Sequence, residues 1–262
     1  MESLKTKGKE YVDQYLDEFV PEQKTKEVVY PESDGKPMSD NTKQFRWIVK
    51  IKENLELLFA DNPDVFIAGD LLWYPVEGNN KIRAAPDTMV AFGRPKGDRG
   101  SYLTWKEDNI APQVVFEILS PGNTPLEMVR KFDFYERYGV EEYYLFDPDN
   151  LILKGWTRVK EKLVLVKNMQ GWISPRLKIR FELRHDDLHI FFPDGSEFLT
   201  TVEMGRLMKS EYSRAEKERL RAERERLKAE KERLKAEKER LRAERLAAQL
   251  RQMGIEPDDN NA

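Results

Sequence analysis

The stretch QVVFEILSPGNTPLEMVRKFDFYERYGVEEYYLFDP, residues 113–148, decides the fold because two β-prone segments flank an amphipathic one. The first segment, 113–120, is strongly apolar and ends at a Pro-Gly pair, and the last segment, 140–148, has the composition of a second strand. Residues 125–138 between them carry helix signals at both ends. A strand, a helix and a strand in this order predict a sheet with a helix packed against it.

One carboxylate interrupts the apolar strand 113–120. Alternation along a strand puts Val114, Phe116 and Ile118 on one face and Glu117 on the other. An unpaired buried carboxylate is costly, so such a group is normally neutralised, paired or bound to a metal. We therefore expect Glu117 to point away from the core face and into a cleft.

The rest of the core supplies a further helix and more strands. Residues 42–59 have apolar residues three and four apart, which predicts an amphipathic helix. Residues 64–75 and 83–93 are predicted to form two β segments with a hairpin turn over 76–81 between them. Residues 154–198 contain several short β-prone pieces, which we interpret as a β-rich annex of the same domain. The predicted fold class is mixed α/β, with a mixed sheet flanked by helices.

Composition divides the chain into four parts. Residues 1–40 are polar, with a possible short helix around Tyr11–Val20, and we interpret them as an N-terminal arm. Residues 41–200 form the folded domain and residues 201–252 a long charged helix. Residues 253–262 are predicted to be a disordered tail.

The charged helix is built from a seven-residue repeat. Four copies of the type ERLKAEK run without a gap from Glu218 to Arg245, and their leucines are Leu220, Leu227, Leu234 and Leu241. A stable coiled coil needs apolar residues at both a and d, whereas here one of the two positions is charged. Two interpretations stay open: a weak coiled coil, or a solvated single helix held by ion pairs between neighbouring turns. A coiled coil would make the chain a homodimer through this helix; a homodimer through the core is the other arrangement we consider.

Charge is distributed unevenly. Residues 205–251 carry 17 Lys and Arg against 10 Glu, whereas residues 1–204 carry 28 basic and 35 acidic residues. An acidic domain argues against a strong non-specific grip on polyanions, although it leaves room for a local basic groove.

Several classes of protein are excluded or disfavoured. The chain has no cysteine, so disulfide and thiolate chemistry are absent, which fits a reducing compartment. The start of the sequence lacks the apolar region of a signal peptide, and nowhere do 18 apolar residues run together. We expect a cytoplasmic protein with no membrane segment. Glycine-rich phosphate loops, nucleophile triads and zinc-type spacings are also missing from the sequence.

A second carboxylate is placed to meet Glu117. Asp87 follows Pro86 where the strand within 83–93 begins, and side chains on adjacent strands can converge. Oxygen ligands on a rigid sheet suit Mg²⁺, which keeps several waters and takes one or two protein carboxylates. Asp87 and Glu117 therefore predict a Mg²⁺ or Mn²⁺ site.

These residues carry a resemblance to a known family. Pro86-Asp87 followed by Glu117 is similar to the PD-(D/E)XK nuclease pattern. The segments APDTMV, PQVVFEILSPGN and KFDFYERYGVEEYYLFDP resemble, more closely, the Uma family of restriction endonucleases, in its cyanobacterial type with a charged C-terminal helix. The likeness covers roughly residues 41–200 and implies a restriction-endonuclease-like core acting on DNA.

The resemblance also implies roles. The general nuclease pattern has Lys two residues after the Glu, where this chain has Leu119, and the family's lysine on the following helix matches Lys131. Asp87 and Glu117 would then hold the metal, while Lys131 would orient the attacking water or help to deprotonate it. A Glu from the first helix is a common extra ligand in this fold. Glu56 and Glu53 are the two candidates here.

Nucleic acid could also be bound by a basic loop. Arg94, Lys96 and Arg99 lie in the long polar segment 93–112 with Trp105 nearby, and could contact phosphates or stack on a base. A solvated loop without that function is the simpler interpretation of the same residues.

Structural interpretations of the site residues compete with the catalytic ones. Glu117 could pair with a buried Arg or Lys, Asp87 could accept hydrogen bonds in a turn, and Lys131 could bridge to Glu127 on the helix surface. The histidines of HDDLH, residues 185–189, have a metal-binding spacing only if they lie on a helix, which their β-prone surroundings disfavour.

Two functional hypotheses follow from the sequence. The first is a Mg²⁺-dependent endonuclease that hydrolyses DNA with Asp87, Glu117 and Lys131. The second is a catalytically inactive nuclease fold that works as a binding or scaffold protein through its C-terminal helix. The first requires the three side chains to lie together.

Overall fold

A computed structural model describes residues 28–33, 35 and 39–253. These residues divide into two compact units, with the boundary between Phe198 and Leu199. The helix expected around Tyr11–Val20, and the tail expected to be disordered beyond Met253, lie outside the described residues.

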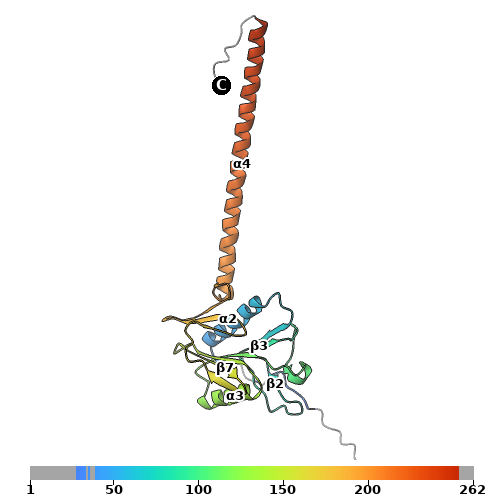
Figure 1. Cartoon of the computed structure of the whole chain (residues 1–262), viewed down its shortest axis with the longest axis vertical. Helices are drawn as coiled ribbons and strands as arrows, with labels where there is room; N and C mark the ends of the chain where they lie inside the picture. The colour runs from blue at the N-terminus through green and yellow to red at the C-terminus, as the bar shows by residue number, and fades with distance from the viewer. Residues whose placement is uncertain (1–27, 34, 36–38, 254–262) are drawn as a thin grey trace, which may run out of the picture. The chain divides into compact units, whose positions relative to one another are not determined.

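A six-stranded mixed sheet forms the centre of the first unit (Figure 1). Strands β5 and β6 run parallel, and the other four neighbouring pairs are antiparallel. The crossover between β5 and β6 is helix α3, Pro125–Arg137, which begins at the N-cap Thr124. In spatial order the strands are β1 (Val65–Ala68), β3 (Thr88–Phe92), β5 (Val114–Ile118), β6 (Glu142–Asp147), β7 (Ile152–Val159) and β8 (Lys162–Leu165).

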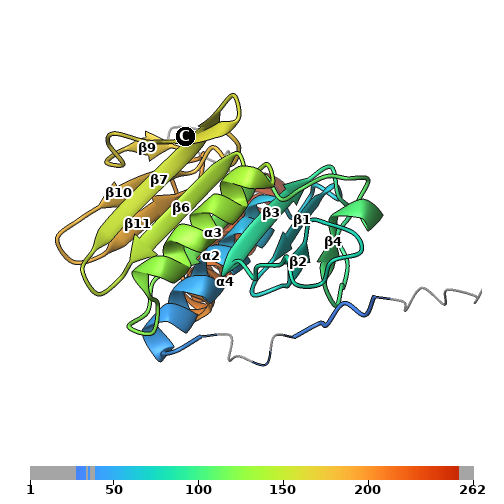
Figure 2. The same ribbon diagram turned by 90° about the horizontal axis from the view of Figure 1, so that it is seen from below.

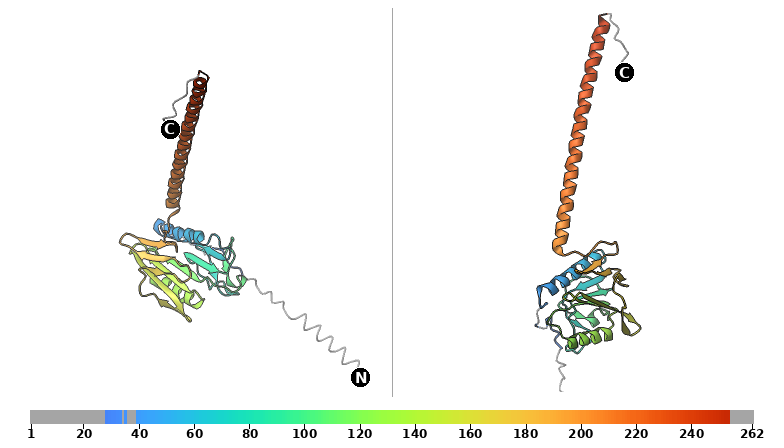
Figure 3. Two further views of the ribbon diagram at one scale, coloured as in Figure 1. Left: turned by 45° about the horizontal axis from the view of Figure 1, so that its top comes forward. Right: turned by 90° about the vertical axis from the view of Figure 1, so that its left-hand side faces the viewer.

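Helices cover both faces of this sheet. Helix α2, Thr42–Leu58, begins at the N-cap Asn41 and packs its buried residues against the face that carries Phe116. Helix α3 packs on the opposite face with Val115 (Figures 2 and 3). The expectation that Glu117 points away from the core is therefore wrong in one respect, since its face is a second core beneath α3. Residue alternation detects the two faces but does not show that both are covered.

The region expected to be one β-rich annex is divided between two sheets. Strands β7 and β8 extend the central sheet, which corrects that expectation. Strands β9 (Trp172–Ile173), β10 (Arg180–Leu183) and β11 (Leu188–Phe191) form a separate three-stranded sheet, whose apolar residues join the core beneath α2.

A short element lies beside the other edge of the central sheet. Strand β2 (Trp73–Tyr74) pairs in parallel with β4 (Tyr102–Leu103), which leads into the 3₁₀ turn η1 (Thr104–Lys106). Trp73 also bridges to Ala84, so the segment 74–83 closes as a loop. The strand after this loop, β3, pairs with β1, not with β2.

The second unit is the single long helix α4, Thr201–Gln252. Thr200 and Glu203 form a capping box at its start, with the Thr200 side chain accepting from the Glu203 N–H. The helix buries none of its residues, and the four repeat leucines are 45–59% exposed. No helix in the described part of the chain is both long and apolar enough to cross a membrane.

Candidate active site

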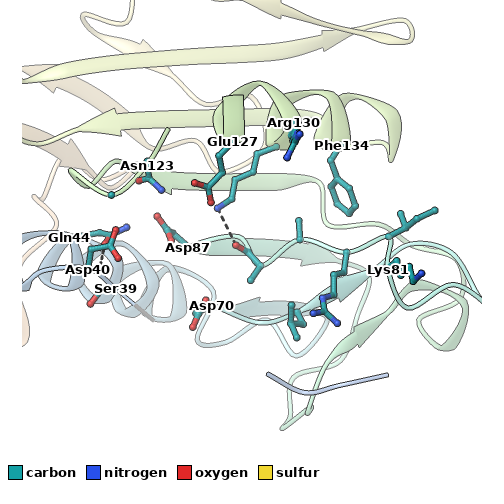
Figure 4. A pocket seen from close by; sticks show the side chains of 17 residues that line it. Ser39, Asp40, Gln44, Asp70, Lys81, Asp87, Asn123, Glu127, Arg130 and Phe134 are labelled. Carbon is teal, nitrogen blue, oxygen red and sulfur yellow. Dashed lines mark hydrogen bonds between the residues drawn. The ribbon is translucent and has the colours of Figure 1, made fainter. Parts of the chain in front are cut away.

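An open cleft of about 650 Å³ lies beside the start of β3 (Figure 4). Its walls come from four parts of the chain: the start of α2, the turn after β1, the segment 81–87 before β3, and α3 with the turn that precedes it. These parts are far apart in sequence, so only the folded sheet brings them together.

Asp87 lies at the base of this cleft and directly precedes β3. Pairing of Thr88 with Phe116 places Asp87 beside the end of β5, where its Oδ2 accepts from the Ile118 N–H at 2.6 Å. The side chain is 7% exposed. Burial raises the pKa of Asp87 well above its usual range, and the negative charge of Glu117 raises it further. The raised pKa therefore reflects the burial of Asp87 first and the nearby charge of Glu117 second.

Glu117 lies in the middle of the same network and is 3% exposed. Its Oε2 is 2.7 Å from the Nζ of Lys131, and its Oε1 accepts from the hydroxyl of Tyr135. Burial raises the pKa of Tyr135 well above its usual range, and the charge of Glu117 acts in the same direction. Tyr135 therefore stays protonated and remains a donor.

Lys131 connects the buried acids to the cleft. It lies on the second turn of α3, and its Nζ also donates to the carbonyl of Ala85 at 3.4 Å. Burial alone would lower the pKa of Lys131, but the charges of Glu117 and Asp87 outweigh that effect and raise it. The amine is therefore held as an ammonium ion.

The structure thus brings Asp87, Glu117 and Lys131 together. Asp87 and Lys131 line the cleft, whereas Glu117 lies behind them and does not. The surface bridge from Lys131 to Glu127, which was the alternative for this lysine, is not formed; the salt bridge of Lys131 goes to Glu117. Strand pairing at β3 and β5 and the helix that follows β5 together produce the convergence.

The donor atoms fit a hard divalent cation in number and type. Two carboxylates completed by waters are the protein share that Mg²⁺ usually takes. Within the described part of the chain, no group of three or more His, Cys, Asp or Glu side chains is arranged to hold a metal. A metal here would therefore rely on two carboxylates.

The prediction of a third ligand from α2 finds no support in the geometry. Glu56 does not line the cleft; its carboxylate lies 3.7 Å from Lys52 and 3.3 Å from Lys96, and it lines a separate cavity. Glu53 pairs with Lys52 at 3.1 Å. Both residues lie beyond the part of α2 that reaches the cleft, which ends at Gln44.

The basic loop predicted to bind nucleic acid is also placed elsewhere. Arg94 and Arg99 both pair with Glu107, and Lys96 pairs with Glu56. The side chains of Arg94 and Arg99 are 11% and 13% exposed, and none of the three side chains lines the cleft. These cations neutralise acids of the protein itself, so the prediction of phosphate contacts is not supported. Glu107 and Asp108 follow closely in sequence and were a usable signal.

Several cleft residues were missed by the sequence analysis. The basic residues Lys81, Arg83 and Arg130 line it, and so does Gln44, whose Nε2 donates to the Ile118 carbonyl at 2.9 Å. Tyr135 was missed because an aromatic residue on a helix indicates core. Its position four residues after Lys131, on the same helix face, was the available signal.

The histidine pair belongs to no site in this region. His185 lies in the turn between β10 and β11, and His189 lies on β11, where its Nδ1 is 2.6 Å from Glu197. The β context expected from sequence is therefore confirmed.

Comparison with known proteins identifies the family to which the sequence is similar. A family model, Uma2, with the description "Putative restriction endonuclease", matches residues 27–184, which is more than half of the chain. Among solved structures, a putative nuclease belonging to DUF820 from Anabaena variabilis ATCC 29413 is similar, with 16% identity over 56% of this chain and 84% of its own, at a TM-score of 0.41. No curated protein matches the chain.

Proposed function

The chain belongs to the Uma2 family, and from this membership and the geometry of the cleft we propose that it is a metal-dependent endonuclease that hydrolyses the phosphodiester bonds of DNA. One observation carries the proposal: Asp87 and Lys131 line a single cleft, and Glu117 lies directly behind them in contact with Lys131. The fold alone would not support it, because one fold hosts many functions.

Asp87 and Glu117 would hold Mg²⁺ or Mn²⁺. Such an ion, when bound, acidifies a coordinated water and stabilises negative charge on a phosphate. Glu117 enters this role with its orientation already fixed, since Tyr135 and Lys131 hold its two oxygens. A fixed carboxylate loses little further freedom when it binds an ion.

Lys131 supplies a positive charge at the surface of the cleft. Of the two roles open to this lysine, orienting water or accepting its proton, the ammonium state favours the first. A cation there would attract the scissile phosphate and stabilise the charge that develops on it. Removal of a group that stabilises developing charge costs roughly 10²–10³-fold in rate.

The test is cleavage of plasmid and linear duplex DNA by the purified full chain with Mg²⁺, with Mn²⁺ and with EDTA. Cleavage is expected only with metal, and it should be lost in Asp87→Asn and Glu117→Gln and strongly reduced in Lys131→Met. Glu142→Gln is the matched control, because Glu142 is an equally buried strand carboxylate whose hydrogen bonds go to Tyr144, Ser174 and Arg176, none of which lines the cleft. Each variant is compared at equal folded fraction by circular dichroism.

Two outcomes would overturn the proposal. Cleavage that survives Glu117→Gln would come from a contaminant or another site. A chain that neither cleaves DNA nor gains thermal stability with Mg²⁺ would instead favour the inactive binding or scaffold protein, because an ion that binds only the folded state must stabilise it.

A further inference from the structure

The charges that line the cleft are partly segregated. Asp40, Asp70 and Asp87 gather toward one end and Lys81 and Arg130 lie toward the other (Figure 4), while Glu127 and Lys131 on α3 also line the cleft. An even mixture of signs would neutralise itself, whereas separate ends can receive two different ligands. The acidic end fits the proposed cation, and the basic end requires its own explanation.

We propose that Lys81, Arg83 and Arg130 form a phosphate anchor that holds a nucleic-acid strand across the cleft. The proposal rests on the proposed function for its substrate class, and goes beyond it in assigning the residues that bind the strand. Three cations suit successive phosphates of a chain better than a single phosphate group.

The availability of these cations supports the anchor. Among the described residues, none of the three has a carboxylate within salt-bridge distance, whereas Arg94 and Arg99 are both neutralised by Glu107. Arg83 is half-buried, and its Nη1 donates to the hydroxyl of Tyr74 at 3.4 Å. A guanidinium that is supported from the protein side and not neutralised is suited to a phosphate.

An aromatic surface lies beside the cations. Arg130 and Phe134 are four residues apart on α3, so they share a helix face, and both line the cleft. Phe134 is half-buried and packs edge-on against Trp73, with ring centroids 5.1 Å apart. Its remaining surface offers a stacking platform for a base, and cations with an aromatic platform are the usual parts of a single-strand binding groove.

Binding in EDTA tests the anchor without any cleavage. The full chain is titrated against a fluorescein-labelled single-stranded DNA of mixed sequence, and the dissociation constant is measured by anisotropy over a range of salt. The triple variant Lys81→Ala, Arg83→Ala, Arg130→Ala should bind at least 10-fold more weakly. Its plot of log K against log salt should flatten by about 0.7 for each phosphate that the variant no longer neutralises.

The control variant removes three positive charges from exposed positions outside the cleft. Arg137, Lys154 and Lys167 are exposed and do not line the cleft, so their triple alanine variant should keep nearly all of the affinity. Equal weakening in both triples, or none in the cleft triple, overturns the anchor. Binding that disappears in the cleft triple of a protein that never cleaves DNA would sink the nuclease proposal and leave the anchor intact. If the cleft triple variant still cleaves DNA with an unchanged KM, the anchor is wrong and the nuclease proposal stands.

A different observation, the charge pattern of α4, carries a second inference. In each repeat the residue after the leucine is basic and the residue three after it is Glu. With the leucines at d, the basic residues occupy e and the glutamates g. The e residues are Arg221, Lys228, Lys235 and Arg242, and the g residues are Glu223, Glu230, Glu237 and Glu244.

Ion pairs within a single helix leave part of this pattern unused. Each Glu from 216 to 239 has Lys or Arg three residues later but Leu or Ala four residues later, so the favourable order of Glu before Lys or Arg occurs only at a spacing of three. The pairs that do form, such as Arg214–Glu218 and Lys235–Glu239, have the weaker reverse order. The exposed leucines also gain nothing in an isolated helix.

We infer that α4 pairs in parallel with α4 of a second copy of this chain. In a parallel pair, g of one helix faces e of the other, so Glu meets Lys or Arg along the whole seam. An antiparallel pair would set Glu against Glu and Lys or Arg against Lys or Arg. The basic residues at a, such as Lys231 and Lys238, weaken the pair and limit it to a modest affinity.

Mass and cross-linking in the full chain test this inference. Light scattering of the native chain should give a dimer, with twice the chain mass of 30.9 kDa. The variant in which Gln replaces the four repeat leucines should give the mass of a monomer. The chain has no cysteine, so Arg245→Cys at an a position should form a disulfide dimer on oxidation, whereas Arg226→Cys on the outer face should not. A single-chain mass before any substitution, or equal cross-linking at both positions, overturns it.

Discussion

Glu117 and Glu142 are two buried carboxylates on neighbouring strands, and the protein stabilises them with different partners. Glu142 is 2% exposed and accepts from three neutral donors: the hydroxyls of Ser174 and Tyr144 and the N–H of Arg176. It packs on the α2 face of the sheet, within the core. Glu142 is therefore an internal acceptor that ties the small sheet to the large one.

Glu117 is equally buried, but its environment is charged. It faces the ammonium of Lys131 and the carboxylate of Asp87, and those two line an open cleft. Burial among aliphatic neighbours, the property that makes Glu117 conspicuous, is thus shared by both acids. The feature that separates them is a network of opposite charges that reaches solvent, and this is the better criterion for a functional site.

Breaking the charged pair should have the largest effect on stability. Lys131→Met leaves Glu117 buried without a counter-ion, so the free energy of unfolding should fall by about 3–5 kcal/mol. Urea denaturation measures it, with Lys162→Met as a control because the Lys162–Glu136 bridge is formed by a lysine that is 75% exposed. A loss of less than about 1 kcal/mol is usual for a surface salt bridge. Such a result would show that the Glu117–Lys131 pair contributes no more than a surface pair.

The two tyrosines on this face of the sheet should differ. Tyr135→Phe removes a hydrogen bond to a charged acceptor and should cost about 1.5–3 kcal/mol. Tyr143→Phe removes a buried hydroxyl that has no partner among the described residues, and should change stability by less than about 0.5 kcal/mol. Thermal melts of both variants give the comparison. Equal costs would show that packing, not the bond to Glu117, determines the effect.

Glu142→Gln should cost about 1–3 kcal/mol, because an amide cannot accept from all three donors. Burial raises the pKa of Glu142 above its usual range. A raised carboxyl pKa contributes stability below the unfolded pKa, and that contribution is lost as pH rises through the folded pKa. The cost of the substitution should therefore grow as pH falls from about 7 to about 4, where unfolded Glu titrates. Urea melts across that range measure it; a cost independent of pH would contradict the raised pKa.

Asp87→Asn should change stability in the opposite direction. Asn keeps an acceptor for the Ile118 N–H and removes a charge disfavoured by burial and by Glu117. In EDTA the variant should be more stable by about 0.5–2 kcal/mol, the usual gain of a stabilising substitution. Mg²⁺ should then stabilise the native chain and not the variant. A variant less stable than the native chain in EDTA would indicate that the Asp87 charge supports the fold.

Much of the fold could be predicted from sequence because its strongest signals are local. Helices α2 and α3 have full apolar periodicity with caps at Asn41 and Thr124, and strand β5 ends at a Pro-Gly pair. The partner of a strand is a non-local property, so the assignment of β7 and β8 to the central sheet could not be derived from their composition. For the same reason the burial of both faces of β5 was not apparent.

The candidate site was predicted partly from the strands and partly from a resemblance. Asp87 and Glu117 were identified from their places on adjacent strands, whereas Lys131 was identified only by the resemblance, and the geometry brings the three together. Arg94 and Arg99 were predicted to contact nucleic acid because basic residues in a loop indicate solvent unless their partners are known, and their pairing with Glu107 leaves that prediction without support. The sequence does not reveal which loop reaches a cleft, because that depends on the packing of distant segments.

The placement of Glu117, Lys131 and Tyr135 has one more consequence. All three lie in the single continuous segment formed by β5, its turn and α3, and only Asp87 comes from outside. Chain termini relocated to the exposed turn between β6 and β7 would leave this segment covalently whole. A circular permutant opened there would therefore carry most of the proposed site in one uninterrupted piece, with Asp87 brought beside it by strand pairing.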